Sequence, residues 1–328
     1  MSKRVLSIVD LMLGRFARFF PVASWRAWVV VAATIFGLAY GLSPEDQTLA
    51  LALLGRRVLP GEAARKAFLV IGRRGGRCRF AAWLAVYVAC FRDYRGVLAA
   101  GERGIVMILC PDRRQARTLF RYVEGLLDGD PMLAAMIVSR TKDSIGLNNN
   151  ISVENHTSTF RPVRGYTIVC AVVDEAAYLP DGESAAPDSE LLAALRPAMA
   201  TAPRALLLVL RSPYARRGDL WNAYHDHFGK DGDPIIVVQA DTRTMNPSVP
   251  EDDDRPGFRA RRQWSEGPVG AVQRDLAEFH SKTVGSMLTK IGQIPQDSGP
   301  SLDDIVFVPS NTDRQVTIHL TVLRGRKT

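Results

Sequence analysis

Three short stretches of the sequence carry residue types that can hold a phosphate group. The first is the glycine-rich run at residues 72–78, which follows an apolar run at residues 67–71. A glycine-rich turn between a strand and a helix points backbone N–H groups at an anion, and the helix N-terminus adds a favourable dipole. The residues that we expect to surround a phosphate here are Gly72, Arg73, Arg74, Gly75, Gly76, Arg77 and Cys78.

This run departs from the full phosphate-binding loop (P-loop) pattern, G-x-x-x-x-G-K-[ST]. Gly76 fits the second glycine, but Ile71 stands where the first glycine belongs. Arg77 replaces the lysine, and Cys78 replaces the hydroxyl residue. On this stretch alone, an ordinary basic turn between a strand and a helix remains an equal alternative.

The second stretch is an acidic pair, Asp174 and Glu175, at the end of the apolar run at residues 167–173. A carboxylate at the end of a buried strand can hold Mg²⁺, and the next carboxylate can orient a water molecule for attack on a phosphate. The alternative is a pair of acidic residues that cap a helix beginning at Ala176.

The third stretch, residues 211–218, follows the apolar run at residues 205–210 and places Ser212 just beyond it. A small polar residue there can sense a terminal phosphate, whereas the alternative is a solvated arginine-rich loop. In an open parallel sheet, ligands bind beyond the carboxyl ends of the strands. Because each stretch follows an apolar run, we expect all three to meet around one nucleotide.

Alternating apolar and helical segments predict the fold that would position these stretches. Short apolar runs that are buried on both faces and separated by helices are typical of an α/β fold with a mostly parallel sheet. We expect strands at residues 67–71, 104–110, 151–154, 157–160, 167–173, 205–210 and 234–239, and helices at residues 80–91, 112–127, 189–199 and 219–228. The first 60 residues read as helices, one of them capped by Ser43 with Pro44 in its first turn. Near the C-terminus we expect a helix at residues 269–291 and two pairing strands at residues 305–309 and 315–322.

Composition sets broad limits on the chain. Its 328 residues suffice for about two domains of roughly 150 residues each, and its net charge of +8 favours a polyanionic partner. The four cysteines form no C-x-x-C pair, which disfavours a metal site or a disulfide framework. The uncharged run at residues 27–42 is shorter than the ~20 residues of a spanning helix. We expect it to be a buried or interfacial helix, with a membrane anchor as the alternative.

Taken together, the three stretches resemble the ATPase of the terminase large subunit, which packages phage DNA. Five further segments agree with that family: SWRAW at residues 24–28, DRRQAR at 112–117, FRPVRGYT at 160–167, LRP at 195–197 and TRTMNP at 242–247. The resemblance covers roughly residues 20–248. It implies a RecA-like P-loop ATPase core, with a mostly parallel sheet flanked by helices and a helical N-terminal segment.

The resemblance also implies roles for individual residues. Residues 72–78 become the Walker A loop with Arg77 at the phosphates, Asp174 the magnesium ligand together with Cys78, Glu175 the catalytic carboxylate and Ser212 part of the coupling motif. The implied cofactors are ATP and Mg²⁺. The implied partners are double-stranded DNA, the portal and small terminase subunits and further copies of the chain, in the cytoplasm of a bacterial host. Arginines that are candidates for DNA or phosphate contacts, rather than ordinary solvated side chains, are Arg161, Arg164, Arg216 and Arg217.

We expect a helical N-terminal segment at residues 1–60, the P-loop ATPase domain at residues 61–248, and a linker with a poorly defined tail at residues 249–328. We expect this tail to lack the nuclease domain of the family, through truncation or a shifted reading frame. Arg77 and Cys78 are poor substitutes for lysine and a hydroxyl group, so we expect weak nucleotide binding and reduced hydrolysis. The alternatives are a non-catalytic remnant that binds DNA or partner subunits, and another P-loop motor such as a helicase.

Overall fold

The computed structural model describes residues 6–110, 113–157, 165–174, 187–211, 219–250, 305–309 and 318–322. The chain separates into two units, Met1–Trp264 and Ser265–Thr328. In the second unit, β9 (Ile305–Pro309) pairs antiparallel with β10 (Ile318–Val322), which confirms the predicted pairing. The helix predicted at residues 269–291 lies outside the described residues.

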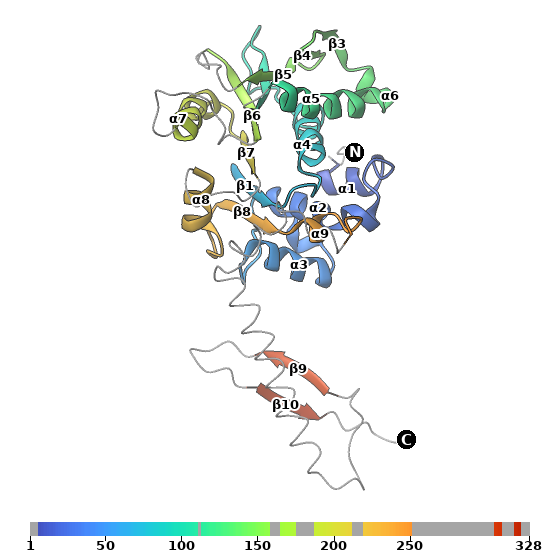
Figure 1. Ribbon diagram of the computed structural model, residues 1–328, viewed down its shortest axis with the longest axis vertical. Coiled ribbons are helices and arrows are strands. Elements are labelled where there is room, and N and C mark those ends of the chain that lie inside the picture. The colour runs from blue at the N-terminus through green and yellow to red at the C-terminus, as the bar shows by residue number, and fades with distance from the viewer. Residues whose placement is uncertain are drawn as a thin grey trace. The chain divides into compact units, whose positions relative to one another are not determined.

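The first unit is built on an eight-stranded sheet (Figure 1). In the order in which they lie, its strands are β3 (Ile137–Arg140), β4 (Ser144–Leu147), β5 (Ile151–Thr157), β2 (Gly104–Cys110), β6 (Thr167–Asp174), β7 (Leu206–Arg211), β1 (Lys66–Ile71) and β8 (Ile235–Ala240). All neighbours from β5 to β8 pair in parallel, while β3 and β4 pair antiparallel at one end. The order β2-β6-β7-β1-β8, in which β7 separates β6 from β1, is that of a RecA-like core. The predicted fold class is therefore confirmed.

The parallel strands form because their sequences are apolar on both faces. Every residue of β2 is buried, and so are all residues of β1 and β6 except the first. A strand of this kind is stable only when helices cover both faces of the sheet. One expectation needs correction: residues 151–154 and Thr157 do not belong to separate strands, because β5 runs unbroken from Ile151 to Thr157. The β3–β4 hairpin was not predicted. Three of the four residues of β3 are exposed, so it carries no apolar run.

Helices cover the two faces of the sheet (Figure 1). On one face lie α7 (Pro187–Ala200) and α8 (Asp219–His227). The other face carries α4 (Arg77–Phe91) and α5 (Arg113–Asp128), followed by the short α6 (Pro131–Ala134). The N-terminal elements and the short helix after β8 lie on the side of α4: α1 (Ile8–Leu13), α2 (Val22–Ile35), η1 (Ala39–Gly41), α3 (Pro44–Leu54) and α9 (Thr242–Met245).

Burial accounts for the uncharged run at residues 27–42. Most of α2 is buried, from Trp25 to Ile35 with the exception of Arg26. The predicted helix is right in kind but wrong in extent: α2 ends at Ile35, whose carbonyl accepts from the Ala64 N–H at 2.8 Å, and Phe36 forms a β-bridge with Ala63. In the part of the chain that the structure describes, no helix is long and apolar enough to cross a membrane.

An aromatic cluster joins the N-terminal segment to α4. The ring of Trp28 stacks on Phe80 with centroids 4.4 Å apart, and Phe16 lies 4.7 Å from Trp83. Phe20 also contacts Trp83, at 5.2 Å. Large aromatic side chains of this kind dominate the energetics of a core. The N-terminal helices thus belong to the same packed unit as the sheet.

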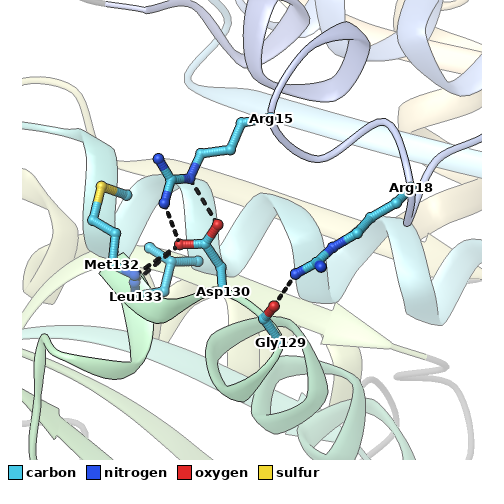
Figure 2. A network of polar contacts seen from close by, with 6 residues as sticks. All are labelled: Arg15, Arg18, Gly129, Asp130, Met132 and Leu133. Atoms are coloured by element: carbon cyan, nitrogen blue, oxygen red, sulfur yellow. Dashed lines mark hydrogen bonds and ion pairs between the residues drawn. The ribbon is translucent and has the colours of Figure 1, made fainter.

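Two arginines of the segment after α1 form hydrogen bonds with the junction of α5 and α6 (Figure 2). The guanidinium of Arg15 donates from Nε and Nη2 to the two carboxylate oxygens of Asp130, at 2.7 and 2.8 Å. The same carboxylate caps α6 by accepting from the N–H groups of Met132 and Leu133. Arg18 donates to the carbonyl of Gly129. The hydrogen bond from Arg15 is the main reason why the pKa of Asp130 lies below its usual value.

We expect Asp130→Ala to lower the free energy of unfolding by about 1–3 kcal/mol at pH 7, because it removes the cap and the partner of Arg15. A carboxylate with a depressed folded pKa stabilises the protein above its unfolded pKa of about 3.9, and that contribution fades as the pH falls through the folded pKa. The cost of the substitution should therefore shrink towards pH 3 in urea titrations.

The matched control is Asp128→Ala, which breaks the exposed ion pair with Arg140 at 2.6 Å. We expect it to cost under about 1 kcal/mol because solvent screens an exposed pair. Equal costs for the two variants at pH 7 would contradict the role given to Asp130.

Candidate functional site

The candidate site lies at the edge of the sheet where four parallel strands end. The register places Val70 beside Arg211, Ile71 beside Ala240, and Asp174 beside Leu210. The carboxyl ends of β1, β6, β7 and β8 are therefore level with one another. This is the edge at which ligands bind in open α/β sheets.

Beyond Ile71 the chain turns tightly and enters α4 at Arg77, so the loop runs from strand into helix as predicted. Glycine is required at two positions of this turn. A Cβ on Gly72 would lie 2.3 Å from Oγ1 and 2.9 Å from the backbone nitrogen of Thr242. Gly76 has a φ of 89°, in the left-handed region that side chains disfavour. The N-terminus of α4, which can receive an anion, thus begins directly at the loop.

Hydrogen bonds hold the carbonyl groups of this loop in place. The Gly75 N–H donates to the Gly72 carbonyl at 3.2 Å. The other three donors are side chains from distant parts of the chain: Thr242 Oγ1 to the Arg73 carbonyl at 2.7 Å, Asn246 Nδ2 to the Arg74 carbonyl at 3.0 Å, and Trp28 Nε1 to the Gly75 carbonyl at 2.8 Å.

These three side chains were not predicted as site residues. Trp28 packs in the core against Phe80, and its indole N–H also reaches the loop. Thr242 and Asn246 fall in the TRTMNP segment at residues 242–247, which entered only as part of the resemblance. That segment was the signal available in the sequence. The bonds themselves depend on tertiary structure, so no spacing reveals them.

The first two predicted stretches come together at the start of α4. The Cys78 thiol donates to Oδ2 of Asp174 at 3.3 Å, although the two residues are 96 positions apart. Asp174 is only 5% exposed, so its carboxylate is held among neighbouring groups rather than in solvent. A carboxylate oxygen suits Mg²⁺, whereas a thiol is too soft a ligand for it. Of this pair, Asp174 fits the implied metal and Cys78 fits it poorly.

A second metal-binding arrangement was not found near the loop. Within the described ranges, no group of three or more histidine, cysteine or acidic residues could hold a metal ion. Magnesium commonly binds through one or two carboxylates, with water and substrate phosphates as its other ligands. The described part of the site is therefore compatible with a magnesium ion that arrives with a phosphate ligand.

A cavity of about 520 Å³ opens beside the loop. One wall is the loop itself with the first residues of α4, and the other is aromatic. The guanidinium of Arg79 lies over the ring of Trp25 at 4.9 Å and donates to the Phe19 carbonyl. Arg77 is 8% exposed and also lines this space. The lining residues are Ser24, Trp25, Trp28, Arg74, Gly75, Gly76, Arg77, Cys78, Arg79, Thr118, Tyr122, Met245, Asn246 and Ser248.

Volume alone does not identify this cavity as a binding site. A second cavity, of about 530 Å³, lies at the opposite edge of the sheet, between Arg56, Glu62, Lys66 and Asp233. Its lining comes from residues 56–66 and 232–236, the segments that lead into β1 and β8, and not from a loop between a strand and a helix. The loop, and not the size of the cavity, distinguishes the first site.

The remaining predicted residues cannot be placed in the site. Glu175, Ser212, Arg161, Arg164, Arg216 and Arg217 all lie outside the described residues. Two of them directly follow strand ends at the site, because β6 ends at Asp174 and β7 ends at Arg211. The convergence of the third stretch with the other two stays a prediction.

Comparison with known proteins gives likenesses of structure. No protein-family model and no curated protein matches the sequence. The chain is similar to the HK97 bacteriophage large terminase, with 18% identity and a TM-score of 0.45 over 74% of this chain and 49% of that one. It thus spans about half the length of that terminase.

Two further similar structures are of the Thermus phage P74-26 large terminase ATPase domain. The first shares 16% identity, with a TM-score of 0.42 over 73% of this chain and 96% of that one. The second, an arginine-to-alanine mutant of the same domain, shares 16% identity, with a TM-score of 0.39 over 68% and 91% of the two chains.

We expect Thr242→Val to loosen the loop, because it keeps the shape of the side chain and removes the donor to the Arg73 carbonyl. Losing one such bond should cost about 1–2 kcal/mol of unfolding free energy. Trypsin should also cut faster after the exposed Arg73 and Arg74. Thr244→Val is the control, since the Thr244 hydroxyl bonds only Asp241 at the surface. Equal trypsin rates at the loop in both variants would show that Thr242 does not hold it.

Proposed function

We propose that this chain binds ATP at residues 72–78 and is an ATPase of the terminase large-subunit type. The observation that carries the proposal is the 3.3 Å contact between the Cys78 thiol and the Asp174 carboxylate. It joins the residue after the glycine-rich loop to the acidic end of a buried strand. A phosphate-binding loop needs this juxtaposition, because the metal that accompanies the nucleotide must reach both.

We propose a separate role in ATP binding or hydrolysis for each of these residues. The first-turn amides of α4 and the Arg77 guanidinium bind the phosphates, and Asp174 binds Mg²⁺. Magnesium, when bound, neutralises charge on the phosphate oxygens. Glu175, the residue after Asp174, orients the attacking water and accepts its proton. Ser212, the residue after β7, senses the terminal phosphate and passes its loss to the DNA-moving elements.

The aromatic wall of the cavity suits the rest of the nucleotide. Trp25 and Tyr122 offer apolar surface, and Asn246 and Ser248 offer polar groups, within reach of the loop. Such a mixture, mostly apolar with a few polar groups, is typical of small-molecule sites. We propose that the base and ribose lie against this wall while the phosphates lie at the loop.

Hydrolysis is proposed to be slow in this chain. The planar guanidinium of Arg77 cannot replace the compact charge of a lysine at a tightly shaped site. The Cys78 thiol bonds Asp174 but does not offer a hard oxygen ligand to the metal. Both replacements affect the positioning of phosphate and metal, on which phosphoryl transfer depends. A chain that binds nucleotide without turning it over is the second candidate, and the same two residues favour it.

The wider role is proposed from the motifs together with this site. We propose that the chain acts on double-stranded DNA in the cytoplasm of a bacterial host. Its protein partners would be the portal and small terminase subunits, together with further copies of itself. The net charge of +8 agrees with a polyanionic partner.

The test is ATP hydrolysis by the wild-type chain and by Arg77→Lys/Cys78→Ser, measured with and without DNA. We expect the double variant to be faster by about tenfold or more, because lysine and a hydroxyl group restore the phosphate and metal contacts. Adding Glu175→Gln to the double variant should abolish the gain. Binding is measured separately, by titration with a fluorescent ATP analogue.

The matched control is Cys90→Ser/Arg92→Lys, which makes the same two exchanges at the other end of α4. The Cys90 thiol is shielded from solvent, which raises its pKa to about 12. It takes no part in the proposed chemistry, so the control should leave ATP binding and hydrolysis unchanged. If neither the wild type nor the double variant binds ATP, the proposed function is wrong. If both bind and neither hydrolyses, the non-catalytic candidate stands.

A further inference from the structure

The exposed side of α5 forms a ridge of four residues, Arg114, Thr118, Arg121 and Gly125, which we call the outer ridge. Their spacing of four, three and four residues keeps them on one helix face. All four are exposed. The opposite face carries the side chains that bury the helix against the core: Ala116, Leu119, Phe120, Val123, Leu126 and Leu127.

The outer ridge and its flank carry three arginines, Arg114, Arg117 and Arg121. Arg114, Arg117 and Arg121 take part in no ion pair within the ranges that the structure describes. The nearest acidic residues along α5 are Glu124 and Asp128, and Asp128 is already paired with Arg140. Arg114 and Arg121, both exposed and without an ion pair in the described part of the chain, therefore lie on one side of the helix, and the half-buried Arg117 lies beside them.

One of these charges, Arg114, stands at an unfavourable position along the helix. The N-terminus of a helix carries the positive end of its dipole and favours acidic residues. The first turn of α5 has none, and Arg114 stands in it. A polyanion bound near this end of α5 would compensate both the helix dipole and the Arg114 side chain.

Gly125 is a further observation that favours an external partner for the outer ridge. Glycine inside a helix costs stability relative to alanine, and here nothing lies within 4 Å of where a Cβ would stand. Gly129, one turn later, differs, since its Cβ would meet the Phe19 ring at 2.6 Å. Internal packing therefore requires glycine at 129 and not at 125. A glycine on an exposed ridge leaves room for the close approach of an external backbone.

We propose that the outer ridge of α5 binds the phosphate backbone of double-stranded DNA. The choice of duplex DNA rests on the proposed function, while the need for a polyanion rests on the ridge itself. Arg114 and Arg121 are about 10 Å apart along the helix axis, a span over which a duplex presents several phosphates, one charge per ~1.7 Å. Thr118 of the ridge and the neighbouring Tyr122 also line the cavity beside the loop, so the two ligands would lie next to each other on α5.

The test measures binding of the full chain to a fluorescent duplex of about 30 base pairs by anisotropy, across a range of salt concentrations. Arg114→Gln/Arg121→Gln should weaken binding by roughly tenfold or more and reduce the slope of log K against log salt by about 2, close to 0.9 for each lost phosphate contact. The control is Arg57→Gln/Arg95→Gln, which removes the same charge from exposed positions elsewhere. It should change affinity and slope much less.

Gly125→Glu is the second variant and keeps the test independent of folding. It adds a good helix former at a place with room for a side chain, so the fold should be retained or stabilised. Its carboxylate should repel DNA. Gly125→Ala, which adds only a methyl group, should retain more affinity than Gly125→Glu.

The proposal is overturned if the ridge variants and the control lose equal affinity, or if single-stranded DNA or RNA is bound more tightly than the duplex. ATP-analogue binding should stay unchanged in all ridge variants. If the wild-type chain binds ATP but not duplex DNA, the ridge proposal is wrong and the proposed nucleotide site is unaffected. If it binds duplex DNA through the ridge but does not bind ATP, the proposed nucleotide site is wrong and the ridge proposal holds for the polyanion.

Discussion

The shape of the glycine-rich loop is set by donors that come from outside it. Side chains of Trp28, Thr242 and Asn246 bind three successive carbonyl groups of residues 73–75. These donors come from α2 and from the segment after β8, which are far apart in the sequence of the first unit. A loop with two positive-φ residues, Arg74 and Gly76, would otherwise have many conformations open to it. The shape of this loop at the start of α4 therefore depends on tertiary contacts made across most of the first unit.

This dependence explains why the N-terminal helices are so heavily buried. Trp28 can donate to the Gly75 carbonyl only if α2 is fixed against α4, and its stacking on Phe80 at 4.4 Å supplies that fixation. Arg79 reinforces it by covering the rings of Phe20 and Trp25. The apolar character of α2, which invites comparison with a membrane segment, follows from this packing role. A helix that aligns a loop must exclude water from its contacts, because a competing water would satisfy the same carbonyl groups.

The sequence predicted what local patterns encode and missed what long-range contacts decide. The parallel strands follow from apolar runs, and the approach of Cys78 to Asp174 follows from the rule that ligands collect at strand ends. The β3–β4 hairpin was missed because its edge strand is polar and mostly exposed. The end of α2 at Ile35 was missed because it depends on the pairing of Phe36 with Ala63, which no local signal announces. The donors to the loop were missed for the same reason: they are near it only in the folded chain.

The two replacements in the loop have separate physical consequences for binding and for chemistry. The hydrogen bonds that shape the loop come from Trp28, Thr242 and Asn246, none of which is altered by arginine at 77 or cysteine at 78. The carbonyl groups of the loop are therefore held by residues other than Arg77 and Cys78, and the dipole of the helix N-terminus comes from the backbone. Hydrolysis needs more, since the metal and the terminal phosphate must be placed closely enough to lower the barrier. A thiol that bonds Asp174 at 3.3 Å maintains the packing of the site without supplying that placement. The shape of the loop and the proposed catalysis thus depend on different residues, and the hydrogen bonds of the structure account for the shape.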